Sequence, residues 1–223
     1  MKIKKPKGNN ELIKMENFLE TDDKINIHSK TFEKIMFIYS VAIKELKNKM
    51  EIMQDEYKIL YDYDLIDHIN TRIKSPESIE KKMSKRNIPL QYKNMIEEIN
   101  DIAGIRVICP LKKDIYSIKE FIENIPGLRV IKEKDYITNP KKSGYTSYHL
   151  IVEVPISLSR KLMYVKVEIQ IRTMAMDFWA SLEHKMKYKP KTEISKTASK
   201  ELVSYAKMIQ KLDQKMMILS SKN

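Results

Sequence analysis

Residues Met163–Arg172 read MYVKVEIQIR, and the alternation in this stretch decides the prediction of the fold. From Val165 onward every second side chain is apolar, and the positions between them hold Lys166, Glu168, Gln170 and Arg172. A period of two is typical of a half-buried strand, because successive side chains leave a strand on opposite faces. The stretch therefore predicts a central strand with one face on the core. Its other face either carries chemistry or is an ordinary solvated face.

The composition is typical of a globular protein that prefers anionic partners. The 223 residues are 42% hydrophobic and 32% charged, enough for one large domain with a buried core. The formal net charge of +12 favours nucleotides, nucleic acid or an acidic surface as partners, although solubility alone would also explain it. The sequence has no signal peptide and no long apolar span, so we expect a cytoplasmic protein without membrane contact.

Two kinds of site are excluded by residue type. The chain has 4 glycines and neither a G-x-x-x-x-G-K-[ST] nor a G-x-G-x-x-G motif, which argues against a glycine-rich phosphate cradle. Cys109 is the single cysteine and lies in an apolar run, which excludes an internal disulfide and a cysteine-rich metal site. Arginine and lysine side chains can take the place of such a phosphate cradle.

Long helices are expected near both ends of the chain. Residues 1–28 are polar and irregular, so we predict a flexible arm, followed by a single domain over residues 29–223. From Thr31 to Leu60 apolar side chains recur at spacings of three and four, which predicts a long amphipathic helix. From Ser195 to Leu219 a heptad-like seam predicts another. Both helices are candidates for oligomer contacts or for packing on each other.

A basic helix is predicted after residue 75. Ser75 followed by Pro76 suits an N-cap and a first helical residue. Arg72 and Lys74 precede this terminus, and Lys82 and Lys85 follow along the helix. Because helix N-termini attract anions, these residues form either one basic pocket or a merely solvated helix.

Residues 101–109 predict a strand that is buried on both faces. Asp101 stands at its entrance, and Arg106 lies inside the apolar run. A buried charge needs a partner, so Arg106 either pairs with a carboxylate or binds a ligand. A helix over Asp114–Ile125 and a strand over Leu128–Glu133 are expected next.

The Asn-Pro and Ser-Gly pairs within residues 134–145 predict a loop. Lysines and tyrosines in an irregular segment suit a phosphorylated aromatic ligand, although an ordinary surface loop would look similar. A strand over residues 146–154 follows, in which His149 faces the opposite side from its neighbours.

The last predicted element of the domain is a helix over residues 173–188, after the central strand. Its expected core face holds Met174, Phe178, Leu182 and Met186. The fold class is therefore α+β, with a mixed sheet of about five strands, flanking helices, and long N- and C-terminal helices.

Five motifs, in this order, resemble those of the RelA/SpoT-type alarmone synthetases: RIKSPESI, DIAGIRV, YIxxPKxxGYxSYH, VEIQIRT and FWASLEHK. The resemblance covers residues 32–219 and is greatest to the small, stand-alone synthetases. It implies a nucleotidyltransferase-like fold. It also implies transfer of the β,γ-pyrophosphate of ATP to the 3′-hydroxyl of GDP or GTP, which makes the guanosine tetra- and pentaphosphates of the stringent response.

The resemblance also implies roles for individual residues. Asp101 and Glu168 would hold Mg²⁺, for which Mn²⁺ is an alternative, and Glu168 would activate the 3′-hydroxyl. The ATP-binding residues would be Arg72, Lys74, Ser78, Lys82, Lys85 and Arg106. The GDP- or GTP-binding residues would be Lys134, Lys141, Tyr145, His149, Asp177 and Ala180. Gln170 and Arg172 would support the site.

Partners and alternatives follow from the same resemblance. It implies a homotetramer and raises single-stranded RNA as a further partner. No hydrolysis of the product is expected, because the hydrolase domain of long family members is not found in this sequence. The ranking of GMP, GDP and GTP as acceptors stays open, since Lys134 and Thr146 depart from the residues common in relatives. The alternative function is a non-catalytic RNA- or alarmone-binding regulator.

Overall fold

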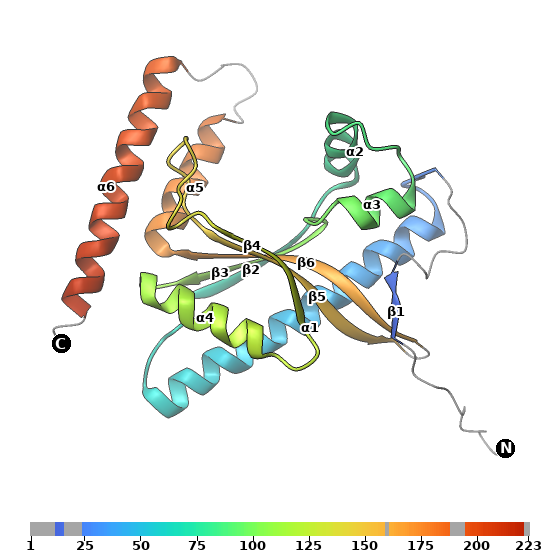
Figure 1. The fold of residues 1–223 in the computed structure, drawn as a ribbon, viewed down its shortest axis with the longest axis horizontal. Helices are drawn as coiled ribbons and strands as arrows, with labels where there is room; N and C mark the ends of the chain where they lie inside the picture. Colours follow the sequence, from blue (N-terminus) through green and yellow to red (C-terminus); the bar gives the residue numbers. More distant parts are fainter. Residues whose placement is uncertain (1–11, 16–23, 159–160, 188–194, 221–223) are drawn as a thin grey trace.

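A mixed sheet lies at the centre of the computed structural model, which describes residues 12–15, 24–158, 161–187 and 195–220 (Figure 1). Its strands follow the order β2-β3-β6-β5-β4, and the short β1 pairs with β6. The strands are β1 (Leu12–Lys14), β2 (His68–Ile73), β3 (Ala103–Cys109), β4 (Arg129–Asp135), β5 (Tyr148–Leu158) and β6 (Lys161–Thr173). Strand β6 runs parallel to β3 and antiparallel to β5, so the predicted mixed sheet is confirmed.

The predicted central strand is β6, and its alternation divides the molecule into two faces. Val167, Ile169 and Ile171 are fully buried, whereas Glu168 and Gln170 point to the other side. Each buried aliphatic side chain of this kind stabilises the fold by roughly 1.5–3 kcal/mol. The apolar face therefore fixes which side of the sheet remains available for polar groups.

Two helices cover the apolar face of the sheet. Helix α1 (Lys30–Tyr61) crosses β2, β3, β5 and β6, and helix α4 (Lys112–Asn124) packs on β3 and β6. Helix α1 begins where the Ser29 hydroxyl accepts a 3.1 Å hydrogen bond from the amide of Phe32, and its stripe from Phe32 to Met53 is buried. The predicted amphipathic helix is thus confirmed.

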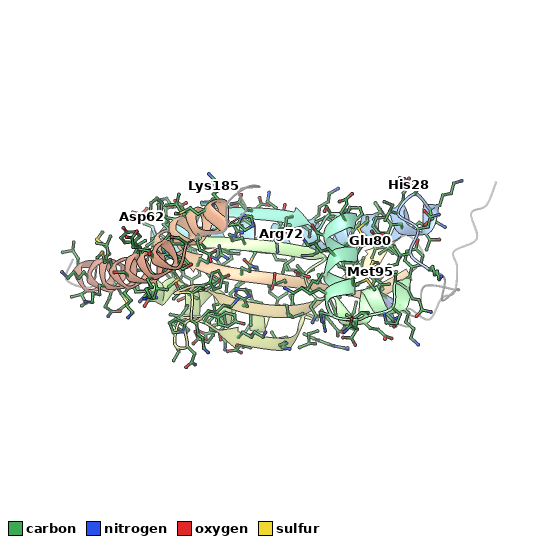
Figure 2. All side chains as sticks on the ribbon, turned by 90° about the horizontal axis from the view of Figure 1, so that it is seen from above. His28, Asp62, Arg72, Glu80, Met95 and Lys185 are labelled. Atoms are coloured by element: carbon green, nitrogen blue, oxygen red, sulfur yellow. The ribbon has the colours of Figure 1, made fainter. Side chains whose placement is uncertain are left out.

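The opposite face is bordered by helices at its two ends. Helices α2 (Pro76–Lys85) and α3 (Tyr92–Glu98) stand at one end, and α5 (Met174–Lys187) and α6 (Lys196–Ser220) stand at the other (Figure 1). Figure 2 looks on to the sheet between them, where Arg72 lies between the helices that carry Glu80 and Lys185. No helix among the described residues has the length and apolar character needed to cross a bilayer.

The predicted core face of α5 is wrong. Met174, Phe178, Leu182 and Met186 are 42% to 61% exposed, whereas Met176, Trp179 and Ala180 are buried. The helix is apolar on two faces, so periodicity alone does not say which of them meets the sheet. The predicted apolar seam of α6 is also largely exposed. Leu202 is buried, but Tyr205, Leu212, Met216 and Leu219 are about half-exposed.

Three described elements have no counterpart in the sequence prediction. Strand β2 reads HINTRI, which lacks a clean apolar alternation, and it lies at the edge of the sheet. Helix α3 has 7 residues, too few for a periodic pattern. Residues 1–11 and 16–23 of the predicted arm lie outside the described residues, but Leu12–Lys14 pairs with β6 and Met15 is buried.

Strand β4 extends further than predicted. It continues through Lys134 to Asp135, so the predicted loop begins two residues later. The Asp135 carboxylate then turns the chain, because it accepts hydrogen bonds of 2.7 Å and 2.9 Å from the amides of Ile137 and Thr138.

Candidate active site

Strand register gathers the predicted site residues into two rows across the open face. One row runs through paired positions from β2 to β4: Asn70, Arg106, Gln170, His149 and Lys134. The neighbouring row is Arg72, Gly104, Glu168, Ile151 and Lys132. Paired residues on adjacent strands point to the same face, so side chains from distant segments lie next to one another.

Gly104 provides space in the second row. A Cβ at this position would lie 3.4 Å from Cγ and Nε of Arg72, so the arginine side chain occupies the space above the glycine. From there the Arg72 guanidinium reaches to 3.9 Å from Oε2 of Glu168. A cation thus lies beside the carboxylate at the middle of the sheet.

Asp101 is held by two lysines just before β3. Nζ of Lys74 lies 3.0 Å from Oδ2, and Nζ of Lys82 lies 2.8 Å from Oδ1. Lys82 comes from α2, which begins as predicted with the Ser75 hydroxyl accepting from the amide of Ser78 at 3.3 Å. Burial alone would raise the pKa of Asp101, but Lys82 and Lys74 together lower it below its usual value. The carboxylate is therefore ionised at neutral pH.

Glu168 receives contacts from three sides. Gln170 donates a 2.8 Å hydrogen bond to Oε2, Nδ1 of His149 lies 3.4 Å from Oε1, and Arg72 stands further out. Burial alone would raise the pKa of Glu168, but the contacts with His149 and Gln170 bring it below its usual value. Glu168 is therefore an ionised, largely buried carboxylate.

His149 connects Glu168 to Tyr145. Its Nε2 lies 2.8 Å from the Tyr145 hydroxyl, which also accepts a 2.6 Å hydrogen bond from Arg172. Because the ionised carboxylate of Glu168 can only accept, Nδ1 carries the hydrogen that faces it, and a neutral ring then accepts at Nε2 from the Tyr145 hydroxyl. Burial, together with Arg172 and Lys141, lowers the pKa of His149 despite the nearby Glu168, so the imidazole is neutral.

A second path joins Arg172 to Glu168. Arg172 donates a 2.9 Å hydrogen bond to the Gln170 side-chain oxygen, and the Gln170 amide donates to Glu168. Together with the path through Tyr145 and His149, this closes a ring of side chains in which every donor is directed toward Glu168. Such connected polar networks hold their members in one geometry.

Asp177 separates two guanidinium groups. Its Oδ1 lies 2.9 Å from Arg172 and 3.3 Å from Arg106. Burial, followed by the proximity of Arg172, lowers the pKa of Arg106, although arginine stays protonated in proteins. Nε of Arg106 is buried and has no hydrogen-bond partner among the described residues. The charge inside β3 thus has a carboxylate partner in Asp177.

Three cavities lie along this face, with volumes of about 220, 400 and 350 Å³. The predicted residues on the first are Arg72, Arg106, Glu168 and Gln170. Those on the second are Lys82, Asp101, Lys134, Lys141, His149 and Glu168. Those on the third are Arg72, Arg106, Tyr145, Gln170, Arg172 and Ala180.

Four predicted residues, Lys74, Ser78, Lys85 and Asp177, line none of these three cavities. Ser78 lies at the start of α2, where its hydroxyl accepts a 3.0 Å hydrogen bond from Ser75, and Lys85 is exposed at the last turn of that helix. Lys74 and Asp177 contact residues that do line the cavities: Lys74 pairs with Asp101, and Asp177 pairs with Arg106 and Arg172.

Six residues of the second cavity were missed by the sequence prediction: Arg86, Glu98, Asn100, Lys132, Tyr136 and Ile151. The alternation of Lys132 with Lys134 could have indicated that both point to one face of β4. Nζ of Lys141 lies 4.5 Å from the centre of the Tyr136 ring, and that ring also meets His149 edge-on at 5.2 Å. With Lys82, five cationic side chains line the second cavity, together with the three carboxylates of Glu98, Asp101 and Glu168. Glu98 pairs with Arg86 at 3.3 Å, and the remaining groups suit phosphates with a bound cation.

The donor set fits a magnesium ion that is shared with a substrate. Asp101 and Glu168 line the same cavity, and the described part of the chain has no group of three or more acidic, histidine or cysteine side chains arranged to hold a metal ion by itself. Mg²⁺ is commonly held by one or two carboxylates together with substrate phosphates, rather than by a complete protein cage. A pair of ionised carboxylates beside lysines and arginines matches that requirement.

Comparison with known proteins gives consistent results. A model described as the region found in RelA / SpoT proteins matches residues 71–193. The GTP pyrophosphokinase YwaC of Bacillus subtilis is 43% identical over 182 residues, which cover 82% of this chain and 87% of YwaC. The GTP pyrophosphokinase YjbM of the same organism is 36% identical over 187 residues, which cover 84% of this chain and 87% of YjbM.

The solved structures agree in fold. Small alarmone synthetase 1 from Bacillus subtilis, in a crystal structure bound to its product pppGpp, superposes with a TM-score of 0.80 at 34% identity. The match covers 87% of this chain and 98% of that chain.

Proposed function

This chain belongs to the RelA/SpoT family, and we propose that it is a GTP pyrophosphokinase of the small alarmone synthetase type. It would transfer the β,γ-pyrophosphoryl group of ATP to the 3′-hydroxyl of GDP or GTP and release AMP. The observation that carries this proposal is the pairing of two ionised carboxylates, Asp101 and Glu168, with five cationic side chains around one cavity. The match to pyrophosphokinases over most of their length supports it.

Glu168 would be the general base of the reaction. Its pKa is lowered, so it is ionised, and the contacts from His149 and Gln170 hold its two oxygens in place. As the acceptor 3′-oxygen forms its bond to the β-phosphorus of ATP, the 3′-proton passes to Glu168. The bond from the β-phosphorus to the α,β-bridging oxygen breaks, and AMP leaves with the electron pair. Phosphoryl transfer depends mainly on positioning and charge neutralisation, which this face supplies.

Arg72 and Arg106 would bind the adenine of ATP on the first cavity. Guanidinium planes stack well on aromatic bases, and both arginines line the first cavity. Lys74 and Lys82, which pair with Asp101, would neutralise the triphosphate. Ser78 and Lys85 on α2 are expected to contribute at the outer end of the same chain of phosphates.

Tyr145 would stack on the guanine of the acceptor, next to Asp177 and Ala180 on α5. Its ring lines the third cavity, and its loop also carries Lys141, whose Nζ lies 4.6 Å from the ring centre. Lys134 and Lys141 would bind the acceptor's 5′-phosphates, with Lys132 as an additional cation. The sequence prediction placed His149 on these phosphates. Its ring nitrogens contact Glu168 and Tyr145, so we propose that His149 positions these two side chains.

Asp101 and Glu168 would hold the Mg²⁺ ion, with Mn²⁺ as an alternative. When bound, the ion supplies charge neutralisation on the transferred phosphates. The lysines on Asp101 would then move to the phosphates, since one carboxylate oxygen cannot serve an ammonium group and a metal ion equally well.

An oligomer, in particular a homotetramer, would cover apolar surface left open on the long helices. Phe178, Leu182 and Met186 on α5 and Tyr205, Leu212 and Met216 on α6 are each at least 42% exposed. Exposed apolar faces of this kind commonly mark subunit contacts. ATP and guanosine nucleotides are cytoplasmic metabolites, and we propose that the enzyme works there.

The test is a thin-layer assay with γ-labelled ATP, Mg²⁺ or Mn²⁺, and GMP, GDP or GTP in turn. A labelled guanosine product that persists on longer incubation is expected with GDP and GTP. No product with any acceptor or metal from folded protein would overturn the proposal. Steeply salt-dependent RNA binding by that inactive protein would then favour the RNA-binding regulator.

A further inference from the structure

The acceptor loop rests directly on the C-terminal helix. Gly144 has a φ of +89°, and a Cβ built on it would lie 2.5 Å from the Cβ of Ala206 in α6. Real Cβ atoms do not approach one another so closely, so this position requires glycine for two reasons at once, the positive φ and the contact with α6. The same Cβ would lie 3.6 Å from the Trp179 ring of α5. The loop is therefore wedged against two helices at the residue before Tyr145.

Hydrogen bonds fix α6 in this position. The Trp179 indole donates a 3.0 Å hydrogen bond to the Leu202 carbonyl, and the Gln210 side chain donates one of 3.5 Å to the Gly144 carbonyl. Further along, the Thr173 hydroxyl donates a 2.9 Å hydrogen bond to the buried carboxylate of Asp213. Three contacts thus join α6 to α5, to the loop and to the end of β6.

Tyr145 belongs to the apolar cluster that joins the loop to α5 and α6. Trp179, Ala180, Leu202 and Ala206 are buried together, and Tyr145 and Ile209 pack against them. One side of the Tyr145 residue thus contacts the cluster, while its hydroxyl meets Arg172 and His149 in the site. Any movement of α6 at Ala206 is transmitted to Gly144 and so to the aromatic ring.

We propose that α6 is a positioning element for the guanosine acceptor and that Ala206, acting through Gly144, sets where the Tyr145 ring stands. The inference rests on the proposed function, because it assigns Tyr145 to the acceptor. Helix α6 lies beyond residues 71–193, the region that the family model matches. The helix therefore contributes to substrate binding from outside the matched region, without itself touching ATP.

The contact between the loop and α6 predicts that a change in α6 weakens binding of one substrate only. ATP would bind across β2, β3 and α2, and no residue of α6 lines the first or the second cavity. Displacing the loop should therefore weaken binding of GDP and leave the binding of ATP unchanged. A purely structural role for α6 would instead affect both substrates together.

The test compares Ala206→Val with Ser204→Val, which adds bulk at an exposed position of the same helix. The Km values for GDP and ATP would be measured for both variants and for the unmodified chain. GDP binding would be followed separately by the fluorescence of Trp179, the single tryptophan, which lies in the apolar cluster beside Ala206. Ala206→Val should raise the Kd and Km of GDP about tenfold, as overpacking of one side of the loop would predict, with the ATP Km unchanged. Ser204→Val should match the unmodified chain.

Equal Km values in all three proteins, or equal losses for ATP and GDP, would overturn the inference while leaving the proposed function intact. An unmodified chain that binds no guanosine nucleotide would overturn both. If Ala206→Val folds poorly, a second pair of variants tests the same contact. Gly144→Ala should also weaken GDP binding, and adding Ala206→Gly should restore part of it by removing the opposing methyl group. Strictly additive effects of this pair would count against the contact.

Discussion

Nδ1 of His149 lies 3.4 Å from Oε1 of Glu168, and the two residues come from adjacent antiparallel strands. Because Nε2 of the same ring contacts the Tyr145 hydroxyl, the imidazole bridges the carboxylate that we propose as the base and the loop that would hold the acceptor. A neutral histidine suits this bridge, since it donates with one nitrogen and accepts with the other. Under the proposed function, one side chain would therefore link binding of the acceptor to the orientation of the base.

Replacement of His149 by alanine should lower kcat by about 10- to 100-fold, because Glu168 loses a donor and Tyr145 loses an anchor. Steady-state kinetics with ATP and GDP would measure the change, and the Km of ATP should stay close to its original value. His28→Ala is the matched control, since His28 is exposed ahead of α1. An undiminished kcat would show that His149 is dispensable for positioning.

Glu168→Gln should abolish transfer while the protein remains folded, because the substitution removes a charge and keeps the shape. Loss of the base and of a metal ligand corresponds to several kcal/mol, or on the order of a 10³-fold drop in rate. Glu153→Gln is a suitable control, because Glu153 lies on β5, 3.9 Å from Arg129, and lines none of the three cavities of the site. Retained turnover in Glu168→Gln would contradict the role of Glu168.

Tyr145→Ala should raise the Km of the guanosine acceptor about 10- to 100-fold, as loss of one base-stacking contact predicts, with a much smaller effect on ATP. Tyr145→Phe separates the two functions of this residue, because it keeps the ring and removes the hydroxyl that meets His149 and Arg172. The phenylalanine variant should keep the acceptor Km and lose part of kcat. Equal effects of Tyr145→Ala on both substrates would contradict stacking on guanine.

The outward direction of the site residues could be predicted from the sequence, because alternation is a local property. Glu168 and Gln170 on β6 and His149 on β5 all face the side that their parity predicts. Their partners could not be predicted from the residues alone, because register is decided by packing between strands distant in sequence. Nothing in HINTRI indicates that Asn70 pairs with Arg106, and the spacing of residues does not reveal that Gly104 lies beside Glu168.

Helix α5 shows the limit of periodicity. Its apolar series at Met174 and Phe178 looks like a core face, but Trp179 is the side chain that becomes buried. The reason lies in α6, which offers Leu202 and Ala206 as partners to Trp179. Which face of an apolar helix is buried thus depends on another element, and only the assembled structure contains that information.

Asp213→Asn should change how the stability of the fold depends on pH. Asp213 is 3% exposed, and burial raises the pKa of its carboxyl above the usual value, although Thr173 and Lys112 act in the opposite direction. The folded state therefore holds the proton more tightly than the unfolded state. The contribution of Asp213 to stability is fully present below the usual pKa of about 3.8, and it is lost as pH rises through the raised value.

An asparagine cannot ionise, but its side-chain oxygen can still accept the hydrogen bond from Thr173. The free energy of unfolding of Asp213→Asn, relative to the unmodified chain, should therefore increase with pH from about 4 upward and then level off. The total change is about 1.4 kcal/mol for each unit by which the pKa is raised. Urea unfolding of both proteins between about pH 4 and 7 measures this difference. Asp114 also has a raised pKa but is present in both proteins, so its contribution cancels. Parallel stability curves over this range would mean that Asp213 is not held in a protonation-sensitive environment.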